Sequence, residues 1–381
     1  MTRIFLSPPD VGPAEKSALA RAFETNYITS AGPELDAFEA EVAEYCHRRH
    51  AVGLSSCTAA LHLSLLVLGV KPGDRVVTST MTFAATVNSI IHAGAVPVLV
   101  DCDQTGNMDP GLLEVALDSL ADKGQRVAAV MPVDLLGKLA DYDRINAIAG
   151  DRSIPVVSDA AEGMGATLGG RPAGSFGISA AVSFNGNKIM TTSGGGMYLT
   201  DDEELAQHVR KLSTQAREPV LHYEHTEIGY NYRLSNLLAG LGRAQLSRLP
   251  EMMGRRRQVR EFYRGLFSGV DGVEIFDGGN DLEDSCWLTS ILVDPSTAGW
   301  QSADLISSLA GDDIETRPLW KPMHLQPVHL GLDYFTHDEH PAGGISADLF
   351  SRGVTFPSGS ALTDADLDRI HQSIGTFLET R

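Results

Sequence analysis

The segments Ile154–Asp159 (IPVVSD) and Ala180–Lys188 (AAVSFNGNK) decide how this sequence is interpreted. Each begins as a short apolar run typical of a buried strand, and the first run ends on Asp159 while the second leads through a polar loop to Lys188. An aldehyde cofactor with a pyridine ring needs an amine for its aldehyde and a carboxylate for its ring nitrogen. The two segments therefore predict a pyridoxal-phosphate enzyme.

Short apolar runs alternate with helical patterns over the first half of the chain, which is typical of parallel β/α construction. Helices fit between these runs at Thr58–Leu68 and Phe83–Ala93, so we expect a three-layer α/β domain with a mostly parallel sheet. The expected strands are Ala51–Leu54, Arg75–Thr78, Val96–Val100, Val127–Val133, Ile154–Ser158, Ala180–Phe184 and Gly196–Leu199.

The second half of the chain shows a different pattern. Leu234–Pro250 has a helical pattern, and we expect the basic stretch Arg255–Arg260 to continue it as a long connecting helix with a solvated basic face. The elements expected after this helix are the strands Trp287–Val293 and Ile314–Arg317 and a closing helix over Asp364–Leu378. Because 381 residues exceed what one core usually fills, we predict a large domain over 1–250 and a smaller α/β domain over 251–381.

Composition narrows the classes of function. The net charge of −19 argues against nucleic acid and anionic membranes as partners. No apolar run reaches the roughly 18 residues of a membrane span, and the N-terminus lacks a signal-peptide core. The four cysteines are far apart, which favours reduced thiols in a cytoplasmic protein. Two histidine pairs, His222 with His225 and His337 with His340, have spacings that could bind a metal. The sequence around them shows no pattern of four converging ligands, so we expect no metal.

Two early loops are candidates for holding the cofactor. Ser55–Ala60 (SSCTAA) joins a strand to a helix, where free backbone N–H groups and the helix dipole can hold a phosphate. The alternative is that its hydroxyl groups only cap the helix. Phe83 follows the next strand, where it either stacks on a pyridine ring or belongs to the core.

Asp159 and Lys188 are stronger candidates. A carboxylate after a buried strand needs a cation or hydrogen-bond donors, and a protonated pyridine nitrogen is such a cation. Glu162 either contacts the cofactor or is a solvated helix charge. Lys188 lies 188 − 159 = 29 residues after Asp159, and a tight turn at Gly194–Gly196 follows it. This arrangement favours a functional lysine over an ordinary surface lysine.

Six short blocks carry a resemblance to a known family. They are Ser55–Leu61 (SSCTAAL), Thr82–Phe83 with Gly94–Pro97 (GAVP), Asp159–Glu162 (DAAE), Ser183–Lys188 (SFNGNK), Gly229–Asn236 (GYNYRLSN) and Phe356–Ser360 (FPSGS). In this order they resemble the DegT/StrS family of nucleotide-sugar aminotransferases nearly from end to end. Within that family, SFNGNKIMTTSGGGM, HYEHTEIGYNYRLSN and RPLWKPMHLQP are most similar to C-4 aminotransferases that make amino sugars of the bacillosamine type.

The resemblance implies a fold type I pyridoxal-phosphate transferase. Lys188 would carry the cofactor covalently, Asp159 would bind its ring nitrogen, and Phe83 would stack on its ring. The positions at or next to the phosphate would be Cys57, Thr58 and Ser183. Cys57 replaces a glycine of many relatives, and its backbone N–H can still donate. Glu162 replaces a glutamine of many relatives, which leaves open how residue 162 bonds to the cofactor.

The resemblance also implies a homodimer. Asn231 matches a residue that family members contribute to the cofactor phosphate of the partner subunit, so two active sites would be shared. The segment Arg317–Gln326 gathers two cations, a histidine and an aromatic ring between prolines that limit its flexibility. The expected substrate-binding residues are Ser30, Ser56, Asn231, Arg317, Lys321 and His324.

The implied reaction moves the amino group of L-glutamate to C-4 of a nucleotide-linked 4-keto-6-deoxy sugar. UDP-2-acetamido-2,6-dideoxy-4-keto-hexose is the favoured acceptor, with dTDP- and GDP-linked keto sugars as alternatives. Other relatives of this fold are sugar dehydratases, which lose the lysine, and non-catalytic ligand-binding or regulatory proteins. The presence of both Lys188 and Asp159 favours an aminotransferase.

Overall fold

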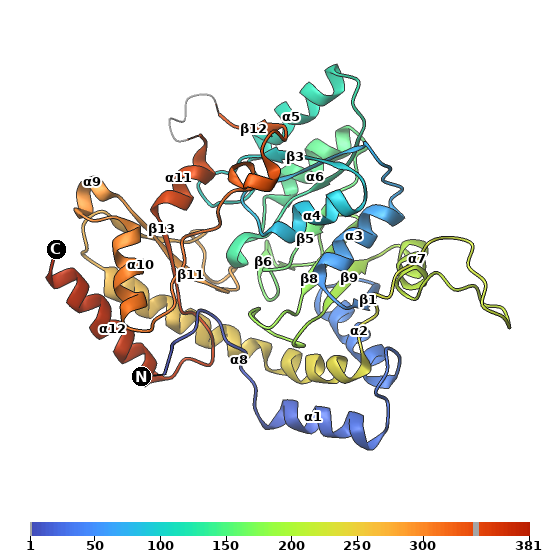
Figure 1. The fold of residues 1–381 in the computed structure, drawn as a ribbon, viewed down its shortest axis with the longest axis horizontal. Helices are drawn as coiled ribbons and strands as arrows, with labels where there is room; N and C mark the ends of the chain where they lie inside the picture. The colour runs from blue at the N-terminus through green and yellow to red at the C-terminus, as the bar shows by residue number, and fades with distance from the viewer. Residues whose placement is uncertain (1, 338–342) are drawn as a thin grey trace.

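Two four-stranded sheets join edge to edge in the computed structural model, which describes residues 2–337 and 343–381 (Figure 1). In spatial order the strands are β1 (His50–Leu54), β9 (Gly196–Thr200), β8 (Ser179–Ser183), β5 (Val157–Asp159), β4 (Val127–Met131), β2 (Arg75–Ser79), β3 (Val96–Val100) and β12 (Tyr334–Phe335). Parallel bridges from Val130 to Val156 and from Val133 to Asp159 connect β4 to β5. β9 is antiparallel to β1 and β8, and the pairings from β8 to β12 are parallel.

Helices cover both faces of the joined sheet. The helices of this part of the chain are α1 (Pro13–Glu24), α2 (Pro33–Tyr45), α3 (Cys57–Val67), α4 (Ala84–His92), α5 (Pro110–Asp122), α6 (Tyr142–Asp151) and α7 (Glu203–Ser213). Successive side chains of a strand point to opposite faces. In β8, Ala181 packs in one core cluster with α3, whereas Ala180 and Val182 pack in another cluster with α2. The predicted three-layer α/β arrangement is therefore confirmed.

One long helix, α8 (Asn236–Phe267), leads from this sheet to a second, smaller part of the chain (Figure 1). There β10 (Val273–Phe276), β11 (Thr289–Val293) and β13 (Gly353–Phe356) form an antiparallel sheet. The helices here are α9 (Pro295–Ala298), α10 (Ser302–Gly311), α11 (Ile345–Arg352) and α12 (Asp364–Glu379). Ile4 packs in the same core as α12, so both chain ends lie here. A division at residue 250 stays a prediction, and this position lies inside α8.

The predicted strand over Ile314–Arg317 is wrong. The segment makes two isolated bridges instead, from Ile314 to Ile4 and from Arg317 to Thr355. One bridge reaches the N-terminal segment and the other reaches β13. The segment therefore passes from one neighbour to the other and does not pair along the length of either one. Pro318 follows at once and has no backbone N–H with which to continue the second pairing.

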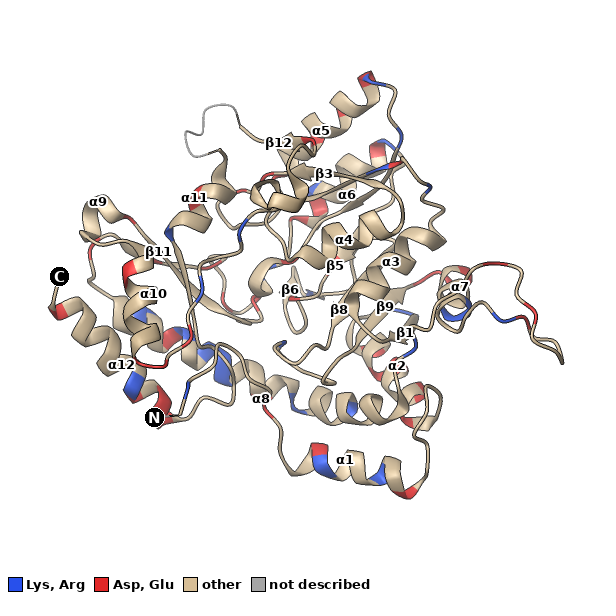
Figure 2. Cartoon of the chain, in the orientation of Figure 1, with Lys and Arg blue, Asp and Glu red and all other residues tan. Residues whose placement is uncertain are grey.

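The solvated basic face predicted for Arg255–Arg260 is also wrong in part. Figure 2 shows basic residues along the part of α8 that lies near the smaller sheet. In this helix, Arg256 and Arg260 are each 1% exposed. Arg260 pairs with two carboxylates, and Arg256 donates to the carbonyl oxygens of Trp287 (2.6 Å) and Ser358 (3.2 Å). Burial lowers the pKa of Arg256 to about 10. These acceptors replace the water that a buried guanidinium loses.

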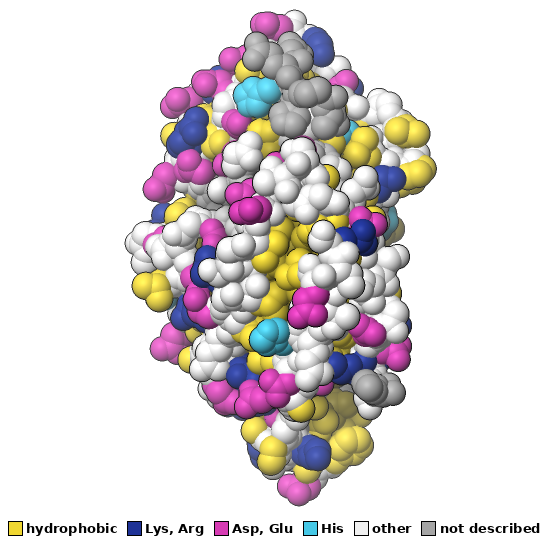
Figure 3. Space-filling model, turned by 90° about the vertical axis from the view of Figure 1, so that its left-hand side faces the viewer, with side chains coloured by type: hydrophobic (Ala, Val, Ile, Leu, Met, Phe, Trp, Pro, Cys, Tyr) yellow, Lys and Arg dark blue, Asp and Glu magenta, His cyan; other side chains and the backbone are white. Residues whose placement is uncertain are grey.

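Charges of both signs are mixed over the surface at the smaller end of the molecule. On the face in Figure 3, acidic and basic side chains of the described residues alternate around a band of apolar side chains, and no broad basic patch forms among them. The helices that the structure describes include none that is both long and apolar enough to cross a bilayer.

Gly196 lets β9 approach the start of α3. A Cβ atom at this position would lie 2.6 Å from the carbonyl carbon of Ser56 and 2.7 Å from Cα of Cys57, which is far inside van der Waals contact. Both are backbone atoms, so no flexible side chain can yield. The strand and the helix N-terminus can therefore meet only because position 196 has no side chain.

We expect Gly196→Ala to lower the free energy of unfolding by at least about 2 kcal/mol, because the added methyl group forces the strand and helix apart. Chemical denaturation with matched m-values measures this change. Gly150→Ala is the control: this glycine is in α6 with no atom within 4 Å of an added Cβ, so alanine should stabilise by about 0.5–1 kcal/mol. Equal effects of the two substitutions would contradict the steric argument.

Candidate active site

A cavity of about 300 Å³ opens at the edge where the carboxyl ends of β1, β2, β5 and β8 meet. Ligands of open α/β sheets usually bind at this edge, because the loops that follow parallel strands converge there. The predicted residues that line the cavity are Ser56, Cys57, Thr58, Phe83, Asp159, Glu162, Ser183 and Lys188. All of the predicted cofactor-binding residues except Asn231 therefore lie together.

Asp159 ends β5 and is 3% exposed. Its Oδ2 accepts a hydrogen bond from Thr86 Oγ1 (2.7 Å), and its Oδ1 accepts one from the backbone N–H of Ala161 (3.2 Å). Burial raises the pKa of Asp159 to about 6, although these two donors and Lys188 act in the opposite direction. The carboxylate is thus held in one orientation, and none of the cations among the described residues pairs with it, so a cation placed beside it would compensate for the lost solvation.

Two threonine hydroxyls form a hydrogen-bonded chain that ends at Asp159, and neither was predicted from the sequence. Thr86 gives its hydroxyl proton to Asp159, so Thr82 Oγ1, 2.6 Å away, is the donor to Thr86. Both side chains are buried and line the cavity. Their positions one turn apart at the start of α4 were visible in the sequence, but their direction toward Asp159 was not, because 73 residues separate Thr86 from it.

Lys188 lies between a carboxylate and an aromatic ring. Its Nζ is 3.4 Å from Glu162 Oε1 and 4.0 Å from the centre of the Trp287 ring. The second oxygen of Glu162 accepts the backbone N–H of Leu136 (2.8 Å), so the carboxylate is fixed. Glu162 is 4% exposed, which contradicts its interpretation as a solvated helix charge.

The start of α3 presents free donors to the cavity. Ser56 caps the helix by accepting the N–H of Ala59 (3.1 Å), which confirms the capping alternative for this hydroxyl. Among the described residues, no acceptor bonds the backbone N–H groups of Cys57 and Thr58. Free N–H groups at a helix N-terminus are a ready site for an anion.

Phe83 and Trp320 stand at the mouth of the cavity. Phe83 is 56% exposed, so it is not a core residue, and its ring centre lies 5.6 Å from that of Trp320. A second cavity of about 780 Å³ shares Trp320 and Asn187 with the first and includes Arg317 and Lys321 in its lining. The first cavity therefore adjoins a larger one that carries two cations.

Three predicted residues lie outside both cavities. Ser30 is exposed in the loop between α1 and α2, and Asn231 is exposed in a bridge to Thr214. His324 turns away, with its Nδ1 2.8 Å from Thr80 Oγ1 and its ring stacked 3.8 Å from Tyr334. Burial lowers the pKa of His324, so the neutral imidazole is favoured there.

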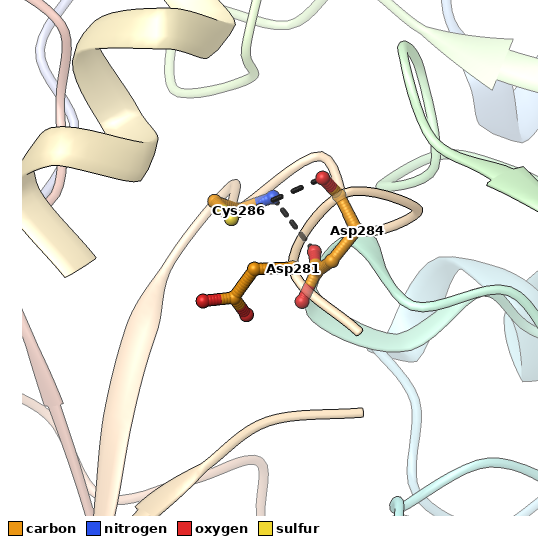
Figure 4. Close-up of side chains that lie close together, drawn as sticks. All are labelled: Asp281, Asp284 and Cys286. Atoms are coloured by element: carbon orange, nitrogen blue, oxygen red, sulfur yellow. Dashed lines mark hydrogen bonds between the residues drawn. The ribbon is translucent and has the colours of Figure 1, made fainter. Parts of the chain in front are cut away.

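One group of side chains has the residue types of a metal site. Asp281, Asp284 and Cys286 place ligand atoms within 4.8 Å of one another (Figure 4). However, Arg260 Nη1 bonds Asp281 Oδ1 (2.9 Å) and also contacts Asp284 Oδ2, and Arg264 contacts Asp281. Arginine charges thus already neutralise the carboxylates, and burial raises the pKa of Cys286 to about 12, which disfavours the thiolate that binds metal. This group is an ion-pair cluster at the start of β11.

The cavity matches the chemical groups of pyridoxal phosphate. Lys188 offers an amine for the aldehyde, Asp159 offers a buried carboxylate for the ring nitrogen, and Cys57 and Thr58 offer backbone N–H groups for the phosphate. Phe83 offers an exposed ring at the mouth. The aldehyde, the ring nitrogen, the phosphate and the ring of the cofactor each have a chemical counterpart in this one cavity.

Comparison with known proteins gives the same result. A model of the DegT/DnrJ/EryC1/StrS aminotransferase family matches residues 9–375. The chain is 41% identical over 369 residues to "Putative pyridoxal phosphate-dependent aminotransferase EpsN" of Bacillus subtilis (strain 168), covering 97% of this chain and 94% of that protein. It is 34% identical over 383 residues to GDP-perosamine synthase of Caulobacter vibrioides, covering 99% of each.

A solved structure agrees in fold. The PLP-form of "Putative sugar aminotransferase Spr1654" from Streptococcus pneumoniae superimposes with a TM-score of 0.88 at 29% identity, covering 100% of this chain and 99% of that one. The cavity, the family match and these likenesses agree on one chemistry. The chain therefore belongs to the DegT/DnrJ/EryC1/StrS aminotransferase family and is a pyridoxal-phosphate-dependent sugar-nucleotide aminotransferase.

Proposed function

We propose that this enzyme transfers the amino group of L-glutamate to the 4-keto carbon of a nucleotide-linked 6-deoxy sugar, with UDP-2-acetamido-2,6-dideoxy-4-keto-hexose as the preferred acceptor. The observation that carries the proposal is that the two cavities lie side by side. The smaller one holds Lys188 and Asp159, and it shares Asn187 and Trp320 with a larger one that carries Arg317 and Lys321. A sugar beside Lys188 would thus leave its nucleotide in the larger space.

Pyridoxal phosphate, when bound, supplies an electron sink for the transfer. Lys188 would carry it covalently and, once its amine is free, would move protons as base and acid. In the first half of the reaction Nζ accepts the proton from the α-carbon of the amino acid. In the second half Nζ delivers a proton to C-4 of the sugar. The Glu162 carboxylate, 3.4 Å from Nζ in this structure, keeps the amine close to both carbons.

Asp159 keeps the ring nitrogen of the cofactor protonated in this proposal. Burial has removed the carboxylate from water and raised its pKa to about 6, so a positive charge beside it regains the lost interaction. The hydroxyl of Thr86 and the N–H of Ala161 hold both oxygens in place before the cofactor arrives. Such preorganisation avoids rearrangement during the reaction.

The larger cavity favours an anionic substrate in spite of the acidic chain. Arg317 and Lys321 line it, and cations of these types bind diphosphates by charge and by hydrogen bonds. Arg317 pairs with Glu315 at 2.7 Å, so part of its charge is compensated in this structure. The likeness to a GDP-perosamine synthase supports a GDP-linked keto sugar as the second candidate, and Ser30 and His324 stay predictions as substrate contacts.

We also propose a homodimer with shared active sites. Asn231 is exposed and lies outside the cavities of its own chain, so a role beside a cofactor phosphate would have to be in a second chain. The exposed apolar side chains of the neighbouring segment, Leu221, Tyr223 and Ile228, favour such a contact.

The substrate proposal predicts a ranking of acceptors. With L-glutamate as donor, we expect the highest kcat/KM for UDP-2-acetamido-2,6-dideoxy-4-keto-hexose, and a value at least tenfold lower for a GDP- or dTDP-linked 4-keto-6-deoxyhexose. Production of 2-oxoglutarate, with mass spectrometry of the amino-sugar nucleotide, measures the rates. Lys321→Ala should raise KM for all three acceptors because they share the diphosphate. A GDP-linked sugar as best acceptor would contradict the preference for UDP.

Asp159→Asn should lower kcat by roughly a hundredfold or more, because an amide cannot stabilise a positive ring nitrogen in a buried site. Thr86→Val is the matched comparison, since it removes one hydrogen bond to the carboxylate and should lower kcat only about tenfold. Steady-state rates at saturating substrate measure both effects. A fully active Asp159→Asn enzyme would show that the residue is only structural.

Comparing Asp159→Asn with the wild type also gives a prediction for the stability of the cofactor-free protein. The raised pKa means that the folded chain binds the Asp159 proton more tightly than the unfolded chain, so stability falls as pH rises from about 4 to about 6. The asparagine variant lacks this loss. At pH 8 it should therefore unfold at a higher temperature than the wild type, and at pH 4 this advantage should disappear.

The dimer proposal predicts complementation. Lys188→Ala should lose activity by several orders of magnitude, and Asn231→Asp should lose cofactor because its negative charge repels the phosphate. In a mixed dimer with shared sites, one of the two sites has both residues intact, so activity should partly return. Co-expression with two affinity tags isolates the mixed dimers. Mixed dimers as inactive as both parents would contradict the shared site.

A further inference from the structure

Trp287 reaches Lys188 from a distant part of the chain. It lies just before β11 of the smaller sheet, whereas Lys188 follows β8 of the larger one. The indole is 1% exposed, and Lys188 Nζ lies 4.0 Å from the centre of its ring. A cation over the face of an indole is attracted by the negative charge of the ring face, and the attraction grows when water is excluded.

Two further contacts hold Trp287 in place. Its Nε1–H donates to the carbonyl oxygen of Asn187, the residue before Lys188, at 2.8 Å. The backbone carbonyl oxygen of Trp287 accepts a hydrogen bond from Arg256 Nη1 at 2.6 Å. The same nitrogen also donates to the carbonyl oxygen of Ser358 at 3.2 Å. Because Arg256 is buried in α8, the ring position is tied to the long helix and to the smaller sheet.

Glu162 is a second neighbour of the amine. Its Oε1 lies 3.4 Å from Nζ, and the Lys188 and Glu162 side chains are 11% and 3% exposed. The other charged group in this cavity is Asp159, which is already bonded by Thr86 and Ala161. The amine thus contacts both a fixed carboxylate and a fixed aromatic face, with Lys188 in the lining of the first cavity and Trp287 in that of the second.

We infer that the Trp287 ring and the Glu162 carboxylate form a holding site for the Lys188 ammonium group whenever that amine is not covalently engaged. Transamination frees the lysine for part of each cycle, and a free lysine side chain has enough rotamers to leave the reacting carbons. The holding site keeps the ammonium group close and lets it return. Trp287 is a positioning residue in this scheme, because it acts through Lys188.

The inference rests on the proposed role of Lys188, and its test needs neither cofactor nor substrate. Acetic anhydride acetylates a neutral amine: a new N–C bond forms, acetate leaves and the nitrogen loses a proton. A site that holds the protonated form slows this reaction. The rate at Lys188, measured by peptide mass spectrometry on the cofactor-free full-length protein, is divided by the rate at the exposed Lys71. An aminotransferase without this holding site would still be active, so the two proposals fail separately.

We expect Trp287→Leu to raise the relative rate at Lys188 by about two- to thirtyfold, the range of cation–aromatic attraction. Trp287→Phe keeps an aromatic face but loses the hydrogen bond to Asn187, so its rate should stay near that of the wild type. Equal rates in the wild type and Trp287→Leu overturn the inference. A Phe variant as fast as the Leu variant also overturns it, because the hydrogen bond would then be the cause.

Phe276→Leu is the matched control. Phe276 lies under Lys138, whose Nζ is 4.2 Å from its ring centre, and it is also buried. This variant should leave the rate at Lys188 unchanged, and a rise as large as that in Trp287→Leu would show general loosening and overturn the inference. If Trp287→Leu does not fold by circular dichroism, Glu162→Gln replaces it. This substitution should raise the rate by removing the charge, and an unchanged rate overturns the inference.

Discussion

A buried carboxylate that pairs with no cation in the described part of the chain is the constraint on which this structure depends. Asp159 is at the end of a central strand, where burial raises its pKa to about 6. Leaving an ionised group there is costly unless hydrogen bonds and a positive partner compensate it. The chain supplies the hydrogen bonds from Thr86 and Ala161, and pyridoxal phosphate, the cofactor of this family, has the pyridine nitrogen that can supply the positive charge.

The rest of the cavity follows from the sheet order. β1, β2, β5 and β8 point their carboxyl ends to the same edge, so the residues after each strand meet there although they are far apart in sequence. β9 reinforces one side of this arrangement, because Gly196 allows it to touch the first turn of α3. The start of α3 and the loop that carries Lys188 are thus held by backbone packing.

The two halves of the molecule are coupled through buried arginines. Arg256 and Arg260 on α8 bond carbonyl and carboxylate oxygens of the segment that leads into β11, and this segment carries Trp287 to Lys188. Arginines are rarely fully buried unless they are paired. Their presence here places the smaller sheet at a set position against Lys188.

The sequence by itself determined the three-layer fold, the large helix and the candidates Asp159 and Lys188. These follow from local patterns, since apolar strands that end in polar residues and helical periodicity need no knowledge of distant contacts. Glu162, Ser56 and Phe83 stayed ambiguous because burial is a property of the packed molecule. The crossing of Ile314–Arg317 between two neighbours and the burial of Arg256 depend on the same packing. Only the tertiary structure decided that Thr86 bonds Asp159 and that Trp287 lies against Lys188, because 73 and 99 residues (287 − 188) separate these pairs, and no sequence periodicity extends over such distances.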